Sequence, residues 1–167
     1  VHLFKYDSVH GRFNGPINAH DNILDIGLGP IQILSEPNLE KLPWKLMNID
    51  LVLECSGRFA NKKDASKHIS SGAKRVLVSA LTEDADQTIV YGVNHNKITP
   101  NCRIISNASC TTNSFAPVAH VLDNAIGIKH GYMTTIHAYT NDQRLVDSLH
   151  TDFRRARAVG ASMIPSY

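Results

Sequence analysis

A cysteine in the stretch Ser106–Asn113, SNASCTTN, has a setting that favours chemistry. The stretch follows the run 103–105, predicted to be a short buried strand, and precedes residues 115–126, predicted to be a helix that ends at Gly127. Cys110 is therefore expected near the backbone N–H groups of the first helical turn, where the positive end of the helix dipole favours thiolate over thiol. This setting predicts a thiolate nucleophile.

Hydroxyl side chains crowd the same turn, so that an anion site is expected beside the nucleophile. The three residues are Ser109, Thr111 and Thr112, and residues of these types cap helix N-termini and bind anions there. The alternative is a buried structural cysteine flanked by capping residues. The strand-to-helix junction favours the nucleophile.

A thiolate nucleophile needs a partner that accepts and donates protons. Histidine is a common partner of this kind, and the chain has nine histidines. His137 alone follows the cysteine in a new strand, expected at 131–139, at the point where the strand meets a loop beginning at Thr140. His120 lies in the predicted cysteine helix and cannot fold back onto Cys110. Because Cys–His pairs serve hydrolases, transferases and aldehyde oxidation alike, the pairing does not choose among these reactions.

The elements that position these residues indicate an α/β fold with a mainly parallel sheet. Near-continuous apolar strands are predicted at 50–55, 75–79 and 88–93, and a helix at 61–71 ends at Gly72. Alternating strands and helices favour right-handed crossovers, which make the sheet parallel.

Small polar residues end or follow three of the predicted strands, those at 50–55, 75–79 and 103–105. Ser56–Gly57, Ser79 and Ser109–Cys110 each lie at the carboxyl end of a predicted strand, which is where such sheets bind ligands. We therefore expect a cofactor crevice at this edge, although each position alone is also typical of an ordinary turn. The Gly27–Gly29 pair is instead predicted to join an antiparallel hairpin, since Pro30 excludes the helix that a dinucleotide turn requires.

Composition excludes several classes of function. The formal charge of +2 argues against nucleic acid or a membrane surface as partner, and the three cysteines show neither zinc spacing nor a disulfide framework. These cysteines fit a reducing compartment, so we expect a cytoplasmic location and no metal site. No apolar run is long enough to span a bilayer. The cluster Arg154–Arg157 favours ion pairs over phosphate or nucleic acid binding.

Several motifs together resemble the phosphorylating glyceraldehyde-3-phosphate dehydrogenases. The run ASCTTN at 108–113 is similar to the active-site signature of that family. The similarity covers nearly the whole chain, through KYDSVHG at 5–11, ECSGRF at 54–59, GVNH at 92–95, HAYTNDQ at 137–143 and RRAR at 154–157. The erythrose-4-phosphate dehydrogenases share the scaffold, but residues 138–141 resemble the triose enzyme more.

The resemblance implies a mechanism and roles for single residues. Cys110 would attack the aldehyde of glyceraldehyde 3-phosphate to give a thiohemiacetal, with His137 as general base. Hydride transfer to NAD would leave a thioester that inorganic phosphate cleaves to 1,3-bisphosphoglycerate, a step of glycolysis. Ser109, Thr111 and Thr140 match the hydroxyls that bind phosphate, and the cofactor-side positions match Ser56, Gly57, Phe59 and Ser79.

The resemblance also implies how the chain is divided. Residues 1–108 match the C-terminal part of the NAD-binding domain, with a Rossmann-like sheet, and residues 109–167 match the start of an α+β catalytic domain, including a loop that packs at the core of a homotetramer. The family's glycine-rich turn and ribose-binding acid lie upstream of Val1, so NADP is not distinguished from NAD. We expect this part alone to be inactive.

Two other functions stay open at this stage. The chain can be a non-catalytic remnant that serves as a binding or assembly module. It can also be a cysteine hydrolase that uses the same Cys–His pair without a cofactor.

Overall fold

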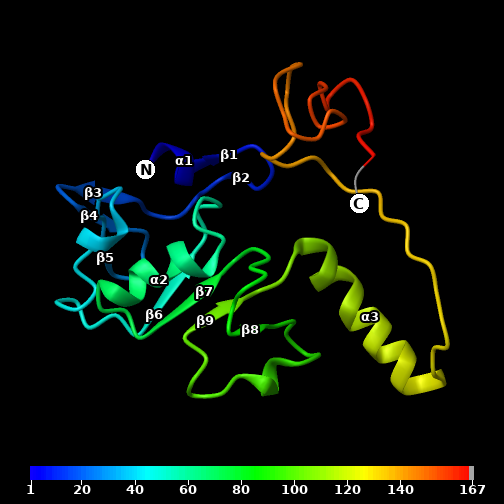
Figure 1. The fold of residues 1–167 in the computed structure, drawn as a ribbon. Helices are drawn as coiled ribbons and strands as arrows, with labels where there is room; N and C mark the ends of the chain where they lie inside the picture. The colour runs from blue at the N-terminus through cyan, green and yellow to red at the C-terminus, as the bar shows by residue number, and fades with distance from the viewer. Residues whose placement is uncertain (166–167) are drawn as a thin grey trace. The chain divides into compact units, whose positions relative to one another are not determined.

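The computed structural model describes residues 1–165, whose contacts divide into two compact units, Val1–His120 and the residues from Val121 onward (Figure 1). The first unit holds three small sheets. Its elements, in chain order, are α1 (His2–Lys5), β1 (Tyr6–Asp7), β2 (Gly11–Arg12), β3 (Asn18–His20), β4 (Ile23–Asp25), β5 (Pro30–Gln32), a 3-10 turn η1 (Leu39–Lys41), β6 (Leu51–Glu54), α2 (Lys62–Ser70), β7 (Arg75–Val78), β8 (Gln87–Thr88), a second 3-10 turn η2 (His95–Lys97), β9 (Ile104–Ser106) and the start of α3 (Cys110–Ile126).

The hairpin predicted around Gly27–Gly29 is confirmed. Strand β4 pairs with β3 and β5, both antiparallel. Gly27 and Gly29 have φ values of 93° and 102°, which glycine adopts without a steric penalty. The Asp25 carboxylate accepts hydrogen bonds from both glycine amides, at 2.7 and 3.3 Å, so this segment is a turn between strands.

The main sheet has four strands in the order β6-β7-β9-β8, and all its pairings are parallel. Glu54 pairs with Val78, and Val78 with Ser106, so the last residues of β6, β7 and β9 lie in one row. The predicted α/β class with a parallel sheet is therefore confirmed.

Helix α2 covers this sheet and closes its core (Figure 1). Asn61 caps the helix by accepting the Asp64 amide at 2.8 Å. Gly72 ends the helix as predicted, with φ +110° and with the Lys45 backbone 2.6 Å from where a Cβ would stand, so that only glycine fits. The buried core residues are Val52, Ala65, Ala73, Val76, Val78 and Ile104, with Trp44 packed against them.

The strand predicted at 88–93 is wrong in its extent, because β8 ends at Thr88. The Asn94 side chain satisfies the backbone there, since its Oδ1 accepts from the Val90 amide at 2.7 Å and its Nδ2 donates to the Thr88 carbonyl at 3.0 Å. These bonds replace a strand ladder, and the chain turns away at Gly92, which has φ +84°.

The strand predicted at 131–139 is also wrong, because the structure assigns no strand to these residues. A strand needs a neighbour for its backbone hydrogen bonds, and the described residues from 127 onward include none. Helix α3 likewise begins at Cys110, five residues before the predicted start. Among residues 1–165, no helix is both long and apolar enough to cross a membrane.

The Asp86 carboxylate binds the backbone at the start of β9, and substitution of Asp86 should destabilise the fold. Its Oδ2 accepts the Arg103 and Ile104 amides at 2.8 and 2.9 Å, and its Oδ1 accepts from Lys62 Nζ at 2.6 Å. Burial opposes ionisation, but these hydrogen bonds outweigh it and hold the pKa of Asp86 below its usual value.

We expect Asp86→Asn to lower the free energy of unfolding by about 1–2 kcal/mol at pH 7. Because the pKa is lower in the folded than in the unfolded state, this contribution is complete above the unfolded value of 3.8 and is lost as pH falls through the folded pKa. Urea unfolding at pH 7 and near pH 3 measures it. Asp50→Asn, which breaks an exposed pair with Lys74, is the control and should change nothing measurable. An equal loss at both pH values would contradict the prediction.

Candidate active site

The carboxyl edge of the main sheet brings together several of the predicted site residues. The Ser79 amide donates to the Glu54 carbonyl at 3.0 Å, and the Asn107 amide donates to the Val78 carbonyl at 2.9 Å. The segments that follow β6, β7 and β9 therefore leave the sheet side by side. They carry Ser56–Gly57, Ser79 and Ser109–Cys110, respectively.

The turn from β9 into α3 is held by Ser106, which is completely buried. Its hydroxyl donates to the Ala80 carbonyl at 2.9 Å and accepts the amides of Thr82 and Ala108, each at 3.1 Å. Ala108 has φ +57°, an uncommon conformation for a residue with a Cβ, and is buried. Such a conformation persists only where the surroundings enforce it, and these bonds supply that enforcement.

Ser109 caps helix α3. Its hydroxyl oxygen accepts the Thr112 amide at 3.1 Å and lies 2.7 Å from the Thr112 hydroxyl. Asn113 secures the same turn through its side-chain amide, which donates to the carbonyls of Asn107 and Ser109 at 2.7 and 2.9 Å. Sequence reasoning missed this role of Asn113, although an Asn four residues after a Ser cap is the signal that could have found it.

Cys110 is the first residue of α3 and is exposed at the helix N-terminus. The alternative expectation, that Cys110 is a buried structural cysteine, is therefore wrong. Cys55 is also exposed, whereas Cys102 is buried and lies 3.4 Å from the Thr99 hydroxyl. Thr111, in the first turn of α3, is half-buried.

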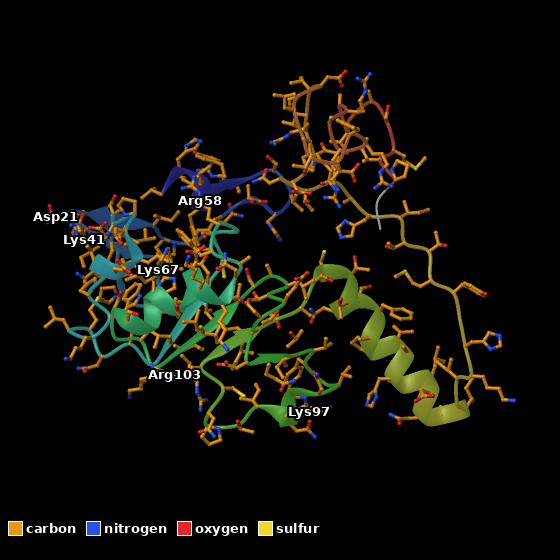
Figure 2. All side chains as sticks on the ribbon, in the orientation of Figure 1. Asp21, Lys41, Arg58, Lys67, Lys97 and Arg103 are labelled. Atoms are coloured by element: carbon orange, nitrogen blue, oxygen red, sulfur yellow. The ribbon has the colours of Figure 1, made fainter. Side chains whose placement is uncertain are left out.

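The segment after β6 is organised by Glu54. Its Oε1 accepts both the amide and the hydroxyl of Ser56, at 2.8 and 2.5 Å, and the Ser56 hydroxyl in turn accepts the Arg58 amide at 3.2 Å. Gly57 has φ +72° with no atom within 4 Å of a would-be Cβ, so its backbone is bare toward solvent. A bare backbone beside small polar groups fits a nucleotide cofactor. Phe59 comes next and is half-buried. Figure 2 labels Arg58, the last residue of this turn.

His137 belongs to the second unit, and its ring has a defined tautomer. Nδ1 lies 2.5 Å from the Ala138 carbonyl oxygen. A carbonyl only accepts, so Nδ1 carries the proton and, in the neutral ring, Nε2 holds the lone pair that a general base needs.

The loop after His137 has its own hydrogen bonds. The amide and hydroxyl of Thr140 both donate to Gln143 Oε1, at 2.6 and 3.0 Å. The arginines of the 154–157 cluster form ion pairs with aspartates of the same loop, as predicted. The pairs are Arg154 with Asp152 at 2.9 Å, Arg155 with Asp142, and Arg157 with Asp147 at 3.0 Å.

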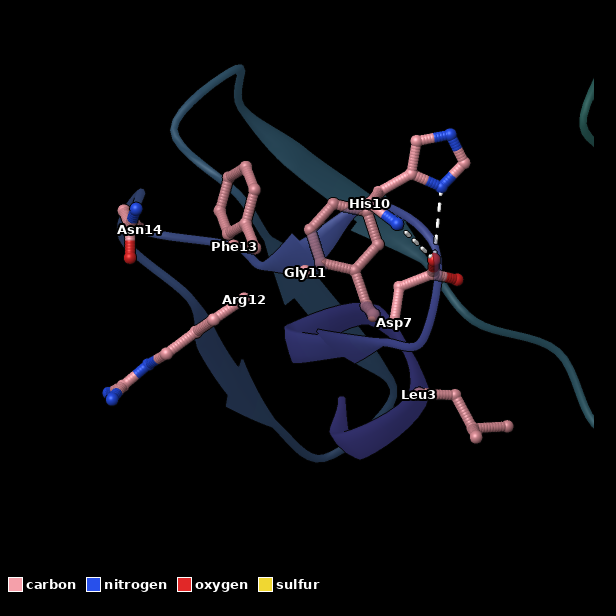
Figure 3. Close-up of a pocket in the computed structure, with 8 residues that line it drawn as sticks. Leu3, Asp7, His10, Gly11, Arg12, Phe13 and Asn14 are labelled. Carbon is pink, nitrogen blue, oxygen red and sulfur yellow. Dashed lines mark hydrogen bonds and ion pairs between the residues drawn. The ribbon is translucent and has the colours of Figure 1, made fainter.

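In the described residues, neither a metal site nor the pocket of the N-terminal hairpin coincides with the predicted site. Within the part of the chain that the structure describes, no three His, Cys, Asp or Glu side chains gather to hold a metal. A pocket at the N-terminal hairpin is lined by residues between Leu3 and Asn14, among which Asp7 accepts the His10 amide (Figure 3). It contains none of the residues predicted for the site.

Substitutions of Ser109 should separate its capping role from the charge beside Cys110. We expect Ser109→Ala to lower the free energy of unfolding by about 1 kcal/mol, because the cap is lost. Ser109→Asp restores the cap but adds a negative charge beside the sulfur, so Cys110 should react several-fold more slowly with iodoacetamide. Peptide mass spectrometry measures this rate, with exposed Cys55 as internal reference. Unchanged alkylation in Ser109→Asp would contradict this electrostatic account.

Comparison with known proteins gives matches along the whole chain. Residues 1–62 match the family model of the glyceraldehyde 3-phosphate dehydrogenase NAD binding domain, and residues 109–167 match that of the C-terminal domain. Among similar proteins are the glyceraldehyde-3-phosphate dehydrogenases of Xanthobacter flavus, 53% identical over 166 residues, and of Geobacillus stearothermophilus, 48% identical over 167.

Each of these alignments covers 99% of this chain and 50% of the relative, so the chain spans about half the length of the curated relatives it matches. The two domain models match in the order in which the sequence motifs resemble the family, and the parallel sheet agrees with a dinucleotide-binding domain. The chain belongs to the glyceraldehyde 3-phosphate dehydrogenase family.

Proposed function

We propose that the protein carrying this chain is an NAD-dependent oxidoreductase that converts glyceraldehyde 3-phosphate and inorganic phosphate into 1,3-bisphosphoglycerate. The observation that carries the proposal is the exposed Cys110 thiol on the first residue of α3, beyond the carboxyl edge of a parallel sheet. The names of the relatives support the reaction, and the domain matches support NAD as the dinucleotide.

The chemistry assigned to Cys110 follows from its place. The first-turn N–H groups and the helix dipole favour the thiolate, which attacks the aldehyde carbon. The oxyanion that forms takes a proton from water and becomes the hydroxyl of a thiohemiacetal. The hydride on this carbon would pass to NAD when the cofactor is bound. The sulfur then holds the oxidised carbon as a thioester, and a phosphate oxygen displaces it, which releases the acyl phosphate and returns the thiolate.

The other residues bind and move protons in this proposal. His137 Nε2 takes the hydroxyl proton as the thiohemiacetal is oxidised. Phosphate groups are bound by the hydroxyls of Ser109, Thr111 and Thr140. The dinucleotide lies against Ser56, Gly57, Phe59 and Ser79 at the sheet edge.

The organisation of the whole protein is part of the same proposal. We place the cofactor domain in residues 1–108 and the start of the catalytic domain in 109–167, of which residues 166 and 167 lie outside those described. The ion-paired loop 142–157 is proposed to face other subunits in a homotetramer in the cytoplasm, and NADP stays open as a second dinucleotide.

Removal of the nucleophile should abolish the reaction. We expect Cys110→Ala to reduce turnover of glyceraldehyde 3-phosphate by about 10³-fold or more, because no thioester can form. The assay follows NADH at 340 nm in the complete protein. Cys55→Ser is the matched thiol control and should keep its turnover. Turnover by Cys110→Ala at the wild-type rate would overturn the mechanism.

Replacement of the proposed base should slow chemistry with little effect on binding. We expect His137→Asn to lower kcat by about 10²- to 10⁴-fold. His130→Asn, an exposed histidine before the loop, is the control. If Cys110 in His137→Asn still reacts with iodoacetamide at the wild-type rate, then the helix rather than the histidine activates the sulfur.

A further inference from the structure

A line of hydrogen bonds runs from the core of the first unit to the carboxyl edge of its sheet. Trp44 Nε1 lies 3.0 Å from His68 Nδ1, and His68 Nε2 lies 2.9 Å from Glu54 Oε2. The other Glu54 oxygen accepts the amide and hydroxyl of Ser56. His68 and Glu54 are 3% and 6% exposed, so their bonds form away from water.

The direction of this line is fixed by its two ends. The indole N–H only donates, so His68 Nδ1 must be the acceptor and carry no proton. His68 is therefore the neutral Nε2–H tautomer, which donates to the carboxylate. The Trp44 N–H thus sets the tautomer of His68, and the His68 Nε2–H then donates to Glu54.

Glu54 is held as a carboxylate by this arrangement. Burial by itself would raise the pKa of Glu54, but the hydrogen bonds from Ser56 and His68 outweigh it and lower the pKa below the usual value. An ionised, buried carboxylate is a strong acceptor with little freedom to move, because departure from its donors leaves a buried charge unpaired.

The line ends on the segment that carries two of the proposed cofactor residues. Glu54 fixes Ser56, whose hydroxyl accepts the Arg58 amide, and this closes the turn around Gly57 with its backbone bare. Trp44, at the other end, packs against the core cluster that contains Val76. The position of the Ser56–Arg58 turn is therefore set by hydrogen bonds to side chains of the core as well as by bonds within the loop.

We propose that Trp44, His68 and Glu54 are positioning residues that hold the Ser56–Arg58 turn in the conformation that receives the dinucleotide. This inference rests on the proposed function. It assigns these residues no contact with the reacting atoms, so they should affect dinucleotide affinity and leave the reactivity of Cys110 alone.

The first test compares two variants that both weaken the core. Trp44→Phe removes the donor at the start of the line, and Val76→Ala, at a fully buried position in the cluster against which Trp44 packs, makes a cavity but removes no hydrogen bond of the line. In the complete protein without NAD, we expect amide hydrogen exchange at Ser56 and Arg58 to be faster in Trp44→Phe only.

With NAD, we expect the KM of Trp44→Phe for the dinucleotide to rise about three- to tenfold, as one hydrogen bond implies, with kcat within about twofold of wild type. Alkylation of Cys110 should be unchanged. Equal changes in Val76→Ala would show a merely structural role and overturn the inference. Faster exchange at the turn with unchanged KM would also overturn it. A wild-type protein that binds no dinucleotide would instead overturn the proposed function, and this inference with it.

A double substitution tests the direction of the line. In Glu54→Gln the new NH₂ group must face either the two Ser56 donors or His68 Nε2. If it faces His68 Nε2, that nitrogen must accept, so the ring proton moves to Nδ1 and opposes the Trp44 N–H. Trp44→Phe removes this opposing N–H. The double variant should therefore bind NAD several-fold more tightly than the combined losses of NAD affinity in the two single variants imply. Strict additivity of the two losses would contradict the assigned direction.

Discussion

Parallel pairing of β6, β7 and β9 is the constraint on which the rest of the first unit depends. Because Glu54, Val78 and Ser106 stand in one row, every segment that leaves these strands starts from the same edge. The chain must then return over a face of the sheet before the next strand, and α2 makes one of these crossings. A slip of β7 by one residue against its neighbours would turn buried Val76 and Val78 outward and misplace the proposed site at the same time.

The edge itself is fixed by two buried polar groups. Ser106 binds the turn before α3 to the segment after β7, while Glu54 binds the turn after β6 to His68 on α2. Each of these side chains has its hydrogen bonds satisfied, and within the described residues no buried side-chain nitrogen or oxygen lacks a partner. Such groups order the edge more specifically than apolar packing can, since their bonds require one geometry.

The sequence predicted those features that depend on local pattern. The apolar runs at 50–55 and 75–79, the helix ended by Gly72 and the hairpin at Gly27–Gly29 were all identified from residue type and spacing, and the structure confirms them. The place of Cys110 at a strand-to-helix junction was predicted from the same kind of pattern, and the structure adds that the residue is exposed. The roles of the site residues stay predictions.

Features that depend on distant partners were missed. The strand at 131–139 was inferred from composition, but a strand forms only against a neighbour. Residues 89–93 looked equally strand-like, yet the Asn94 side chain binds the Val90 amide and the Thr88 carbonyl, and β8 ends at Thr88. His68 gave no signal in the sequence because its surroundings there are polar, and only the packing of α2 buries it against Trp44 and Glu54.

Trapping the intermediate tests the central claim most directly. Complete protein is mixed with glyceraldehyde 3-phosphate and NAD without inorganic phosphate, quenched in acid and digested for mass spectrometry. The account predicts a phosphoglyceroyl thioester on the peptide that carries Cys110, and its loss when phosphate is added before the quench. NADH formation with no adduct on that peptide, or with the adduct on another residue, would contradict it.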